Sequence, residues 1–333
     1  MNSPVNEKPD RPQGMSPEKR ALLAERLAGR PAGGRETPIP RRSGPGPEPL
    51  SFAQQRLWLI DRMEPGGATY NVPYAYRLAG PLSMDVLERA LSEMVDRHEI
   101  LRTTFRMAGD APVQTIGPAI RIMLPVHDLS GLGEREREAS LRELGSAEAR
   151  RPFNLERGPL MRVEIARLSE TDHVLFLTFH HIVFDGWSEG IFFRELQMLY
   201  QAFSRNERSP LPPLPLRYVD YAVWQRESLR GDLLEGQLSY WRERLGGALP
   251  VLDLPLDRTR PPRQSFRGTT RLFKLDAELH SRLVRMSQAE GVTLYMTMLA
   301  AFNVLLWKYT GQQDLVVQLA DNKNVEIDWI SFE

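Results

Sequence analysis

Apolar residues recur along the chain at two spacings, one typical of helices and the other of strands. Recurrence at every third or fourth position predicts an amphipathic helix, and the clearest case is residues 86–95. Similar patterns predict further helices over residues 51–58, 130–151, 191–203, 218–245, 277–289 and 294–309. The segment 130–151 is the most charged of these, so we expect it to be solvated on most of its surface.

Short apolar runs lie between the predicted helices and indicate strands. They cover residues 70–78, 113–126, 161–168, 174–179, 269–273 and 315–319. Because only a short turn at Thr171 and Asp172 separates 161–168 from 174–179, these two runs predict a hairpin. From residue 50 onward the chain therefore alternates between strand and helix patterns.

The first 49 residues have a different character. Residues 29–50 are crowded with Pro, Gly, Arg and Glu, and they cannot bury enough apolar surface to order themselves, so we interpret them as a linker. A short helix is expected before it, with Ser16 as N-cap and Pro17 at the first helical position. This helix could dock against a partner or belong to an idle tail.

Charge and composition exclude several classes of function. The 333 residues include 43 Lys and Arg and 43 Asp and Glu, so no overall field draws the chain to nucleic acid or to an anionic membrane. There is no cysteine, which excludes a disulfide framework, a thiol nucleophile and a thiolate metal site. Since no apolar run approaches the ~20 residues of a membrane span, we expect a cytoplasmic protein.

Residues 178–190 are the stretch around which the chain is organised. It joins a strand pattern to a helix pattern and contains His180 and His181, followed by Asp185 and Gly186. Adjacent strand residues point to opposite faces, so we expect one histidine to be packed, with His180 favoured, and the other to face a cleft. A cleft-facing histidine is a candidate general base. We expect Gly186 to allow the tight bend between strand and helix.

The same stretch permits two rival interpretations. Residues 186–190 match the G-x-S-x-G nucleophile elbow of serine hydrolases, with Ser188 as nucleophile. That fold needs a histidine after the serine, and the later His280 looks like an ordinary helical surface residue, so we expect Ser188 to be the N-cap of the following helix. No metal is expected, because His180 and His181 diverge and no carboxylate cluster accompanies them.

Other candidate residues lie on neighbouring elements. Arg97 follows a helix end, where a cation is an ordinary dipole partner, whereas Arg102 in an apolar strand context should need a buried anion. Tyr218, Tyr221 and Trp224 are spaced as on one side of a helix. They could line a substrate site, although such spacing more often marks core packing.

Four segments carry a resemblance to a known family. Residues 51–58, 97–105, 180–188 and 218–225 resemble, in order and at similar spacing, four successive signature motifs of condensation domains from nonribosomal peptide synthetases. The resemblance covers the chain from about residue 50 to its end. The pattern is similar to the subtype that joins two L-configured aminoacyl groups.

The resemblance implies a fold and a set of partners. The fold would be α/β (α+β two-layer), with a chloramphenicol acetyltransferase-like lobe of mixed sheet and helices and a second lobe of the same type. A tunnel between the lobes would admit two phosphopantetheine arms, one carrying a donor acyl thioester and the other an acceptor amine. No cofactor would bind the chain directly. The partners would be peptidyl or aminoacyl carrier protein domains and neighbouring synthetase modules, with no nucleic acid and no membrane.

The resemblance also implies roles for single residues. His181 would be catalytic, deprotonating or positioning the acceptor nitrogen. Asp185 would be structural, paired with a buried arginine, for which Arg102 is the first choice and Arg97 the reserve. The other motif residues that would support the site are His180, Gly186, Trp187 and Ser188. On the acceptor side, the lining residues would be Tyr218, Tyr221 and Trp224.

The chain departs from the family pattern near residue 320, where the remaining residues only vaguely resemble the next motif. We expect three parts: a linker over residues 1–49, an N-terminal lobe over 50–225 and an incomplete second lobe over 226–333. An alternative of a different class follows. The chain could be an inactive or split fragment that serves as an interaction module, with the apolar and acidic residues 325–333 adding to a partner sheet.

Overall fold

A computed structural model of the chain describes residues 39–42, 44, 46–262 and 273–317. It divides into two units, Met1–Pro40 and Arg41–Glu333, and everything below concerns the second. The predicted N-terminal helix and residues 269–272 of a predicted strand lie outside the described residues.

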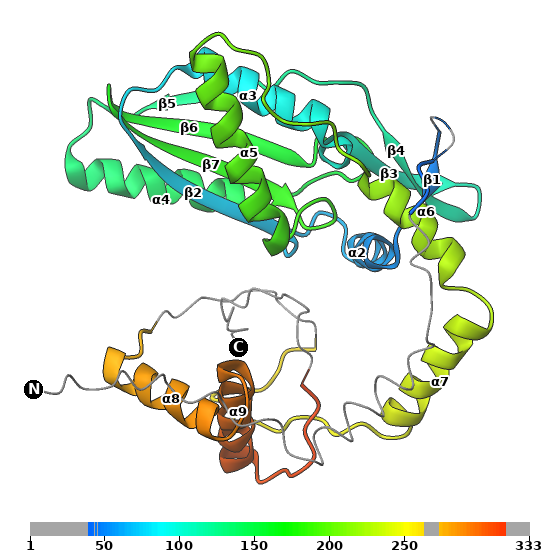
Figure 1. Cartoon of the computed structure of the whole chain (residues 1–333). Helices are drawn as coiled ribbons and strands as arrows, with labels where there is room; N and C mark the ends of the chain where they lie inside the picture. The colour runs from blue at the N-terminus through cyan, green and yellow to red at the C-terminus, as the bar shows by residue number, and fades with distance from the viewer. Residues whose placement is uncertain (1–38, 43, 45, 263–272, 318–333) are drawn as a thin grey trace, which may run out of the picture. The chain divides into compact units, whose positions relative to one another are not determined.

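A four-stranded mixed sheet forms the centre of the fold (Figure 1). Its spatial order is β2 (Asn71–Ala79), β7 (Asp172–His180), β6 (Met161–Ser169) and β5 (Val126–Asp128). β7 runs antiparallel to both β2 and β6, and β5 runs parallel to β6. The predicted hairpin is therefore the β6–β7 pair. Its second strand ends at the histidine pair.

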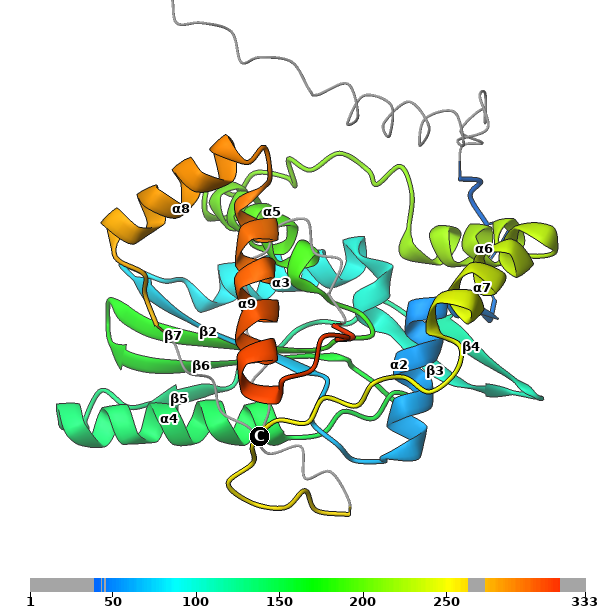
Figure 2. The ribbon, with the colours of Figure 1, turned by 90° about the horizontal axis from the view of Figure 1, so that it is seen from below.

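Helices cover both faces of this sheet, as Figure 1 and the turned view in Figure 2 show. α3 (Met84–Arg97) and α5 (Gly186–Ser204) pack together over one face, and α4 (Glu134–Arg150) contacts β2 and β7 from the other. Odd-numbered residues of β7, such as Leu177, join the cluster under α3 and α5, whereas even-numbered ones, such as Phe176, join the cluster under α4. Because both faces are covered, β7 is apolar at nearly every position.

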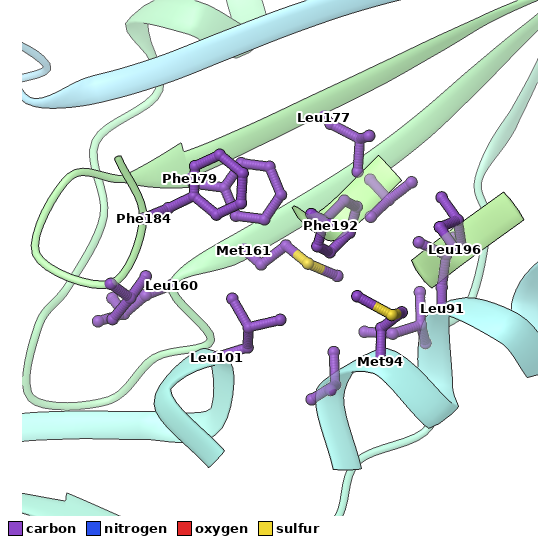
Figure 3. Packing of buried hydrophobic residues seen from close by; sticks show 14 of the residues in the cluster. Leu91, Met94, Leu101, Leu160, Met161, Leu177, Phe179, Phe184, Phe192 and Leu196 are labelled. Atoms are coloured by element: carbon purple, nitrogen blue, oxygen red, sulfur yellow. The ribbon is translucent and has the colours of Figure 1, made fainter. Parts of the chain in front are cut away.

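The larger cluster holds the turn that follows β7. Figure 3 shows Phe179, Phe184 and Phe192 in contact within it. The Phe179 and Phe184 rings stack with centroids 3.8 Å apart, and Phe192 meets both edge-on. This aromatic group fixes the chain on each side of residues 180–183.

A second, three-stranded sheet lies beside the first in sequence and contains part of the predicted linker. Its order is β1 (Glu48–Pro49), β4 (Ala111–Ile116) and β3 (Thr103–Ala108), all antiparallel, and β3 follows the short 3-10 helix η1 (Glu99–Arg102). The expectation of a linker up to residue 49 is thus wrong at its end, because β1 pairs with β4 through backbone hydrogen bonds that the composition of the segment does not reveal.

Earlier residues of that expected linker are also held in place. The Arg41 side chain donates hydrogen bonds to the backbone oxygens of Leu214 and Pro215, at 3.2 and 2.9 Å. The Arg42 backbone N–H donates to the buried carboxylate of Asp220 at 3.0 Å. The ordered lobe therefore begins near residue 41.

Helices α2 (Phe52–Met63) and α6 (Tyr218–Ser228) are joined end to side. Ser51 is the N-cap of α2 and forms a capping box with Gln54, as the preference of serine for this position leads one to expect. The next free N–H of the helix, on Phe52, donates to the Gln225 side chain of α6 at 2.9 Å. The start of α2 is thus completed by α6.

The remaining helices are α7 (Asp232–Leu245), α8 (Ala277–Ala289) and α9 (Leu294–Thr310). The single helical region predicted over residues 218–245 is broken into α6 and α7, because Gly231 adopts a φ of 59°, outside the helical range. Residues 315–317 are not in a strand, contrary to expectation. The lobe boundary at residue 225 stays a prediction.

No single helix among the described residues combines the length and apolar character of a membrane span. α8 and α9 reach that length and hydropathy only when they are counted together across a bend of 103°.

Candidate active site

The two histidines at the end of β7 have opposite environments. His180 is only 4% exposed, whereas His181 is exposed to solvent. Strand alternation leads to this divergence, because His180 is the last strand residue and His181 begins the turn. The predicted packing of His180 is confirmed, and the catalytic role of His181 stays a prediction.

The His181 ring is held in one tautomer. Its Nδ1 lies 2.8 Å from the backbone oxygen of Phe184, and since a carbonyl can only accept, Nδ1 carries the proton. The backbone N–H of His181 also donates to the Tyr70 oxygen at 2.8 Å. Among the described residues, none forms a hydrogen bond with Nε2. The ring therefore presents an unprotonated nitrogen to solvent, which is what a general base requires.

His180 is a neutral structural residue in this arrangement. Its Nδ1 accepts the Ile182 backbone N–H at 3.1 Å, so the ring proton is on Nε2. Burial lowers the pKa of His180 from 6.5 to about 4, and the adjacent His181 lowers it further in the same direction. A protonated His180 would turn a donor toward the Ile182 donor, so the turn depends on the neutral form.

Asp185 caps α5 rather than pairing with an arginine. Its carboxylate accepts the Ser188 backbone N–H at 2.9 Å and the Ser188 hydroxyl at 2.6 Å. The predicted ion pair of Asp185 with Arg102 or Arg97 is therefore wrong. So is the prediction that Ser188 is the N-cap, because Asp185 occupies that position and Ser188 is the third residue of the helix.

The motif glycine and tryptophan also differ from expectation or add to it. Gly186 is the first residue of α5, and its φ is not in the left-handed region. The bend between strand and helix lies instead at residues 181–183, which form the turn. Trp187 is 54% exposed beside this turn, a high value for the largest side chain.

The geometry gives no support to the serine hydrolase. Among the described residues, Ser188 makes no hydrogen bond to a histidine, and its hydroxyl donates to Asp185. A nucleophilic serine needs an adjacent base to take its proton. The later His280 lies exposed on α8.

The two candidate arginines have other anionic partners. Arg97 pairs with Glu195 of α5, with Nε to Oε2 at 3.0 Å, and His98 Nε2 lies 2.7 Å from the same oxygen. Burial alone would raise the pKa of the Glu195 carboxyl, but the hydrogen bonds from His98 and Arg97 outweigh it and the pKa is lowered. Glu195 was not singled out from the sequence. The available signal was a carboxylate beside the apolar stripe that contains Leu196.

Arg102 does lie beside a partly buried anion, as its sequence context indicated. Its Nη2 is 3.6 Å from Glu99, and its Nη1 donates to the Gly117 backbone oxygen. Glu99 also pairs with Arg217 at 2.8 Å and with Arg42 at 3.5 Å. This group ties residue 42 and the start of α6 to η1.

The aromatic residues of α6 form a partly exposed row. Ring centroids of Tyr218 and Tyr221 are 5.6 Å apart, and those of Tyr221 and Trp224 are 6.0 Å apart. The Tyr218 hydroxyl is hydrogen-bonded to the Ser51 hydroxyl at 3.0 Å. Burial raises the pKa of Tyr218, the Ser51 hydrogen bond opposes this, and the charges of Tyr221 and Asp185 reinforce it. The electrostatic effect of Asp185 indicates that Tyr218 lies near the His181 turn.

A cavity of about 110 Å³ lies behind that turn. It is lined by residues of η1, the turn and the start of α5. The lining residues are His98, Ile100, Leu101, Val183, Phe184, Ser188, Ile191 and Phe192. The second motif of the sequence thus meets the third on the side of the turn away from the exposed His181 ring.

Comparison with known proteins identifies the family. The condensation domain model matches residues 46–321, and the chain belongs to this family. A linear gramicidin synthase of Brevibacillus parabrevis is 52% identical over 270 residues, which cover 81% of this chain and 5% of that synthase. Phosphinothricin tripeptide synthetase PhsC of Streptomyces viridochromogenes is 43% identical over 317 residues, covering 94% of this chain and 29% of that synthetase.

A solved structure supports the same fold. The X-domain from teicoplanin biosynthesis, determined in a complex with OxyB, is 34% identical with a TM-score of 0.71. The match covers 81% of this chain and 59% of that chain. The α/β condensation fold predicted from the four motifs is thereby confirmed. The chain spans only a small part of the two synthetases that it resembles.

Proposed function

We propose that the chain catalyses amide bond formation between two substrates carried on separate carrier proteins. The donor would be an acyl or aminoacyl thioester and the acceptor an amine, each on a phosphopantetheine arm. The single observation that supports this role best is the His181 ring, fixed at Nδ1 and open at Nε2. Membership of the condensation family and the two peptide synthetase relatives point the same way.

The chemistry needs one proton acceptor and no redox partner. As the acceptor nitrogen attacks the thioester carbonyl carbon, Nε2 of His181 takes a proton from that nitrogen. The C–N bond forms, the C–S bond breaks, and the departing thiolate takes the proton from His181. The products are an amide on the acceptor carrier and a free thiol on the donor carrier. A positioned base contributes about 10²–10⁴-fold, and holding the two reactants together can contribute more.

Other residues then have supporting roles. His180 and Asp185 hold the two ends of the turn that carries His181. Tyr218, Tyr221 and Trp224 would line the acceptor side, which the nearness of Tyr218 to Asp185 supports. The partners would be carrier domains and neighbouring synthetase modules in the cytoplasm.

The test uses donor and acceptor carrier proteins, each loaded with an L-aminoacyl group, and intact mass spectrometry of the acceptor carrier. The wild-type chain should add the donor mass to the acceptor, and His181→Ala should reduce the rate by at least about a hundredfold. Ser188→Ala is the matched control, because it removes a hydroxyl from the same turn and should retain amide formation. An undiminished rate in His181→Ala would overturn the assignment of the base, and loss of the donor to water that requires Ser188 would indicate a hydrolase.

A second candidate is a non-catalytic interaction module. The observation that favours it is the likeness to the X-domain, which was solved in a complex with another protein. This function predicts no amide from the wild-type chain and a stable complex with a neighbouring synthetase domain in analytical ultracentrifugation. If adding a polypeptide with the rest of the family pattern restored amide formation, the chain would be half of a split enzyme instead.

A further inference from the structure

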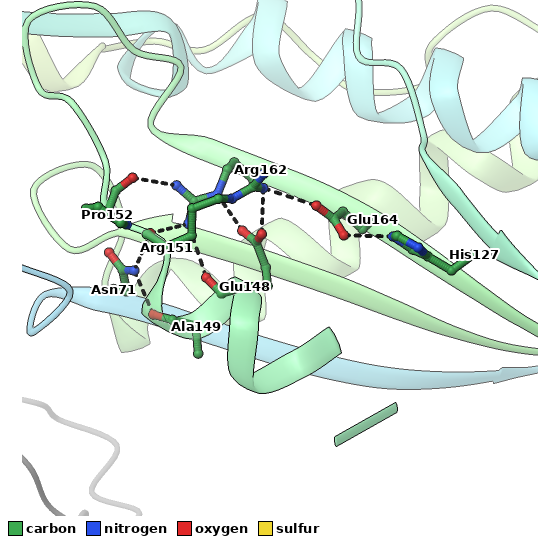
Figure 4. A network of polar contacts seen from close by, with 8 residues as sticks. All are labelled: Asn71, His127, Glu148, Ala149, Arg151, Pro152, Arg162 and Glu164. Atoms are coloured by element: carbon green, nitrogen blue, oxygen red, sulfur yellow. Dashed lines mark hydrogen bonds and ion pairs between the residues drawn. The ribbon is translucent and has the colours of Figure 1, made fainter. Parts of the chain in front are cut away.

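The Arg162 guanidinium is fixed by several acceptors at the end of α4. It pairs with the Glu148 carboxylate and donates to the backbone oxygens of Glu148, Arg151 and Pro152 at 3.2, 2.7 and 3.3 Å, as Figure 4 shows in part. The last carbonyls of a helix have no partner within the helix. Arg162, which belongs to β6, therefore holds the end of α4 and cannot easily rotate.

The same guanidinium covers an aromatic ring that leads to the histidine pair. The Arg162 carbon Cζ lies 3.7 Å from the centroid of Phe153, a close cation–π contact. Phe153 in turn meets His180 edge-on, with centroids 6.1 Å apart and planes at 87°. Phe153 and His180 are 8% and 4% exposed. His180 Nδ1 then receives the Ile182 N–H, next to His181.

We propose that Arg162 is a positioning residue for the His181 turn and acts through Phe153 and His180. The inference rests on the proposed function for its catalytic consequence, although the contacts themselves do not. The fixed cation holds the Phe153 ring by its face. The ring edge then keeps His180 dry and in the orientation that accepts the Ile182 N–H. The turn keeps its shape, and Nε2 of His181 remains aimed at solvent.

The groups that face His180 define what happens when this support is lost. His181 lies on the same segment, Tyr70 contacts His180 with ring centroids 6.4 Å apart, and Arg162 lies beyond Phe153. Without Arg162, Phe153 is free to move and water can reach His180. The protonated ring would then present Nδ1–H to the Ile182 N–H, and the two donors would repel each other. The turn would open at a pH where the wild-type turn is intact.

The experiment compares three variants with the wild-type chain. Arg162→Gln removes the cation, Arg162→Lys keeps the charge without the planar fork, and Phe153→Leu removes the aromatic ring. Arg151→Gln is the matched control, because Arg151 pairs with Glu148 and Glu164 in the same network and its side chain has no ring contact with Phe153. The two readouts are NMR titration of the histidine rings and the pH profile of amide formation.

In Arg162→Gln and Phe153→Leu, the pKa of His180 should rise from about 4 toward 6.5. The maximal rate should fall by about ten- to a hundredfold with KM unchanged, as for misplacement of a catalytic group. Arg162→Lys should recover only part of both, and Arg151→Gln should match the wild type. The proposal is overturned if Arg162→Gln and Phe153→Leu leave the His180 titration as it is in Arg151→Gln. The titration decides this even if no variant forms an amide, in which case the proposed function fails separately.

Discussion

Phe184 provides the sharpest test of how the turn is anchored. Its ring is 4% exposed, stacks on Phe179 at 3.8 Å and meets Phe192 and Tyr74 edge-on at 5.8 and 6.0 Å. Its backbone oxygen accepts the His181 Nδ1–H. One residue therefore joins the core to the candidate base, and removing its ring should disturb both.

Phe184→Ala should lower the free energy of unfolding by about 3–5 kcal/mol, the range for loss of a buried phenylalanine side chain. For a chain of this size about 1 kcal/mol corresponds to about 2–4 °C, so the melting temperature should fall by roughly 10 °C. Phe184→Leu should lose less, because it keeps most of the apolar volume. The assay is thermal unfolding followed by circular dichroism.

The matched control is Met63→Ala, which truncates a side chain that is 73% exposed at the end of α2 and should change stability by less than about 0.5 kcal/mol. If Phe184→Ala were no more destabilising than Met63→Ala, the aromatic stack would not anchor the turn.

Three further perturbations test the interactions around the site. Glu195→Gln should cost about 1.5–3 kcal/mol in chemical unfolding, because Arg97 and His98 lose a charged acceptor; an unchanged midpoint would show that this pair is not needed. Asp185→Asn should leave stability within about 0.5 kcal/mol, since asparagine caps helices as well as aspartate, while Asp185→Ala should cost about 1 kcal/mol; a large loss in Asp185→Asn would point back to an ion pair. For His180, the folded pKa of about 4 lies below the unfolded value of 6.5, so its contribution is complete above pH 6.5 and is lost as the pH falls toward 4. Relative to His180→Gln, the wild type should lose about 3 kcal/mol across that interval, and parallel curves for the two proteins would contradict the buried neutral ring.

Local sequence patterns were enough to predict most elements and the environment of the histidine pair. The spacing of apolar residues located α3, and the continuous apolar run of β7 indicated a strand buried on both faces. Alternation at its end separated His180 from His181. The Asp185 cap is also local, since a carboxylate three residues before Ser188 is a common helix start, and the competing ion pair was preferred wrongly.

The remaining contacts depend on how distant elements pack. Glu195 meets Arg97 because α3 and α5 lie side by side on one face of the sheet, and no spacing along the chain encodes that distance. The pairing of the two-residue strand β1 with β4 is likewise too short to leave a periodic pattern. The cation–π contact of Arg162 with Phe153 requires the end of α4 and the start of β6 to meet, which only the fold reveals.

The central claim is that His181 offers a bare Nε2 while His180 holds its own proton on Nε2. Long-range ¹H–¹⁵N correlation spectra of the histidine rings at neutral pH measure this directly, with His180→Gln and His181→Gln for assignment. The account predicts protonated Nδ1 and unprotonated Nε2 for His181, and the opposite tautomer for His180. A His181 ring that carries its proton on Nε2 would contradict it.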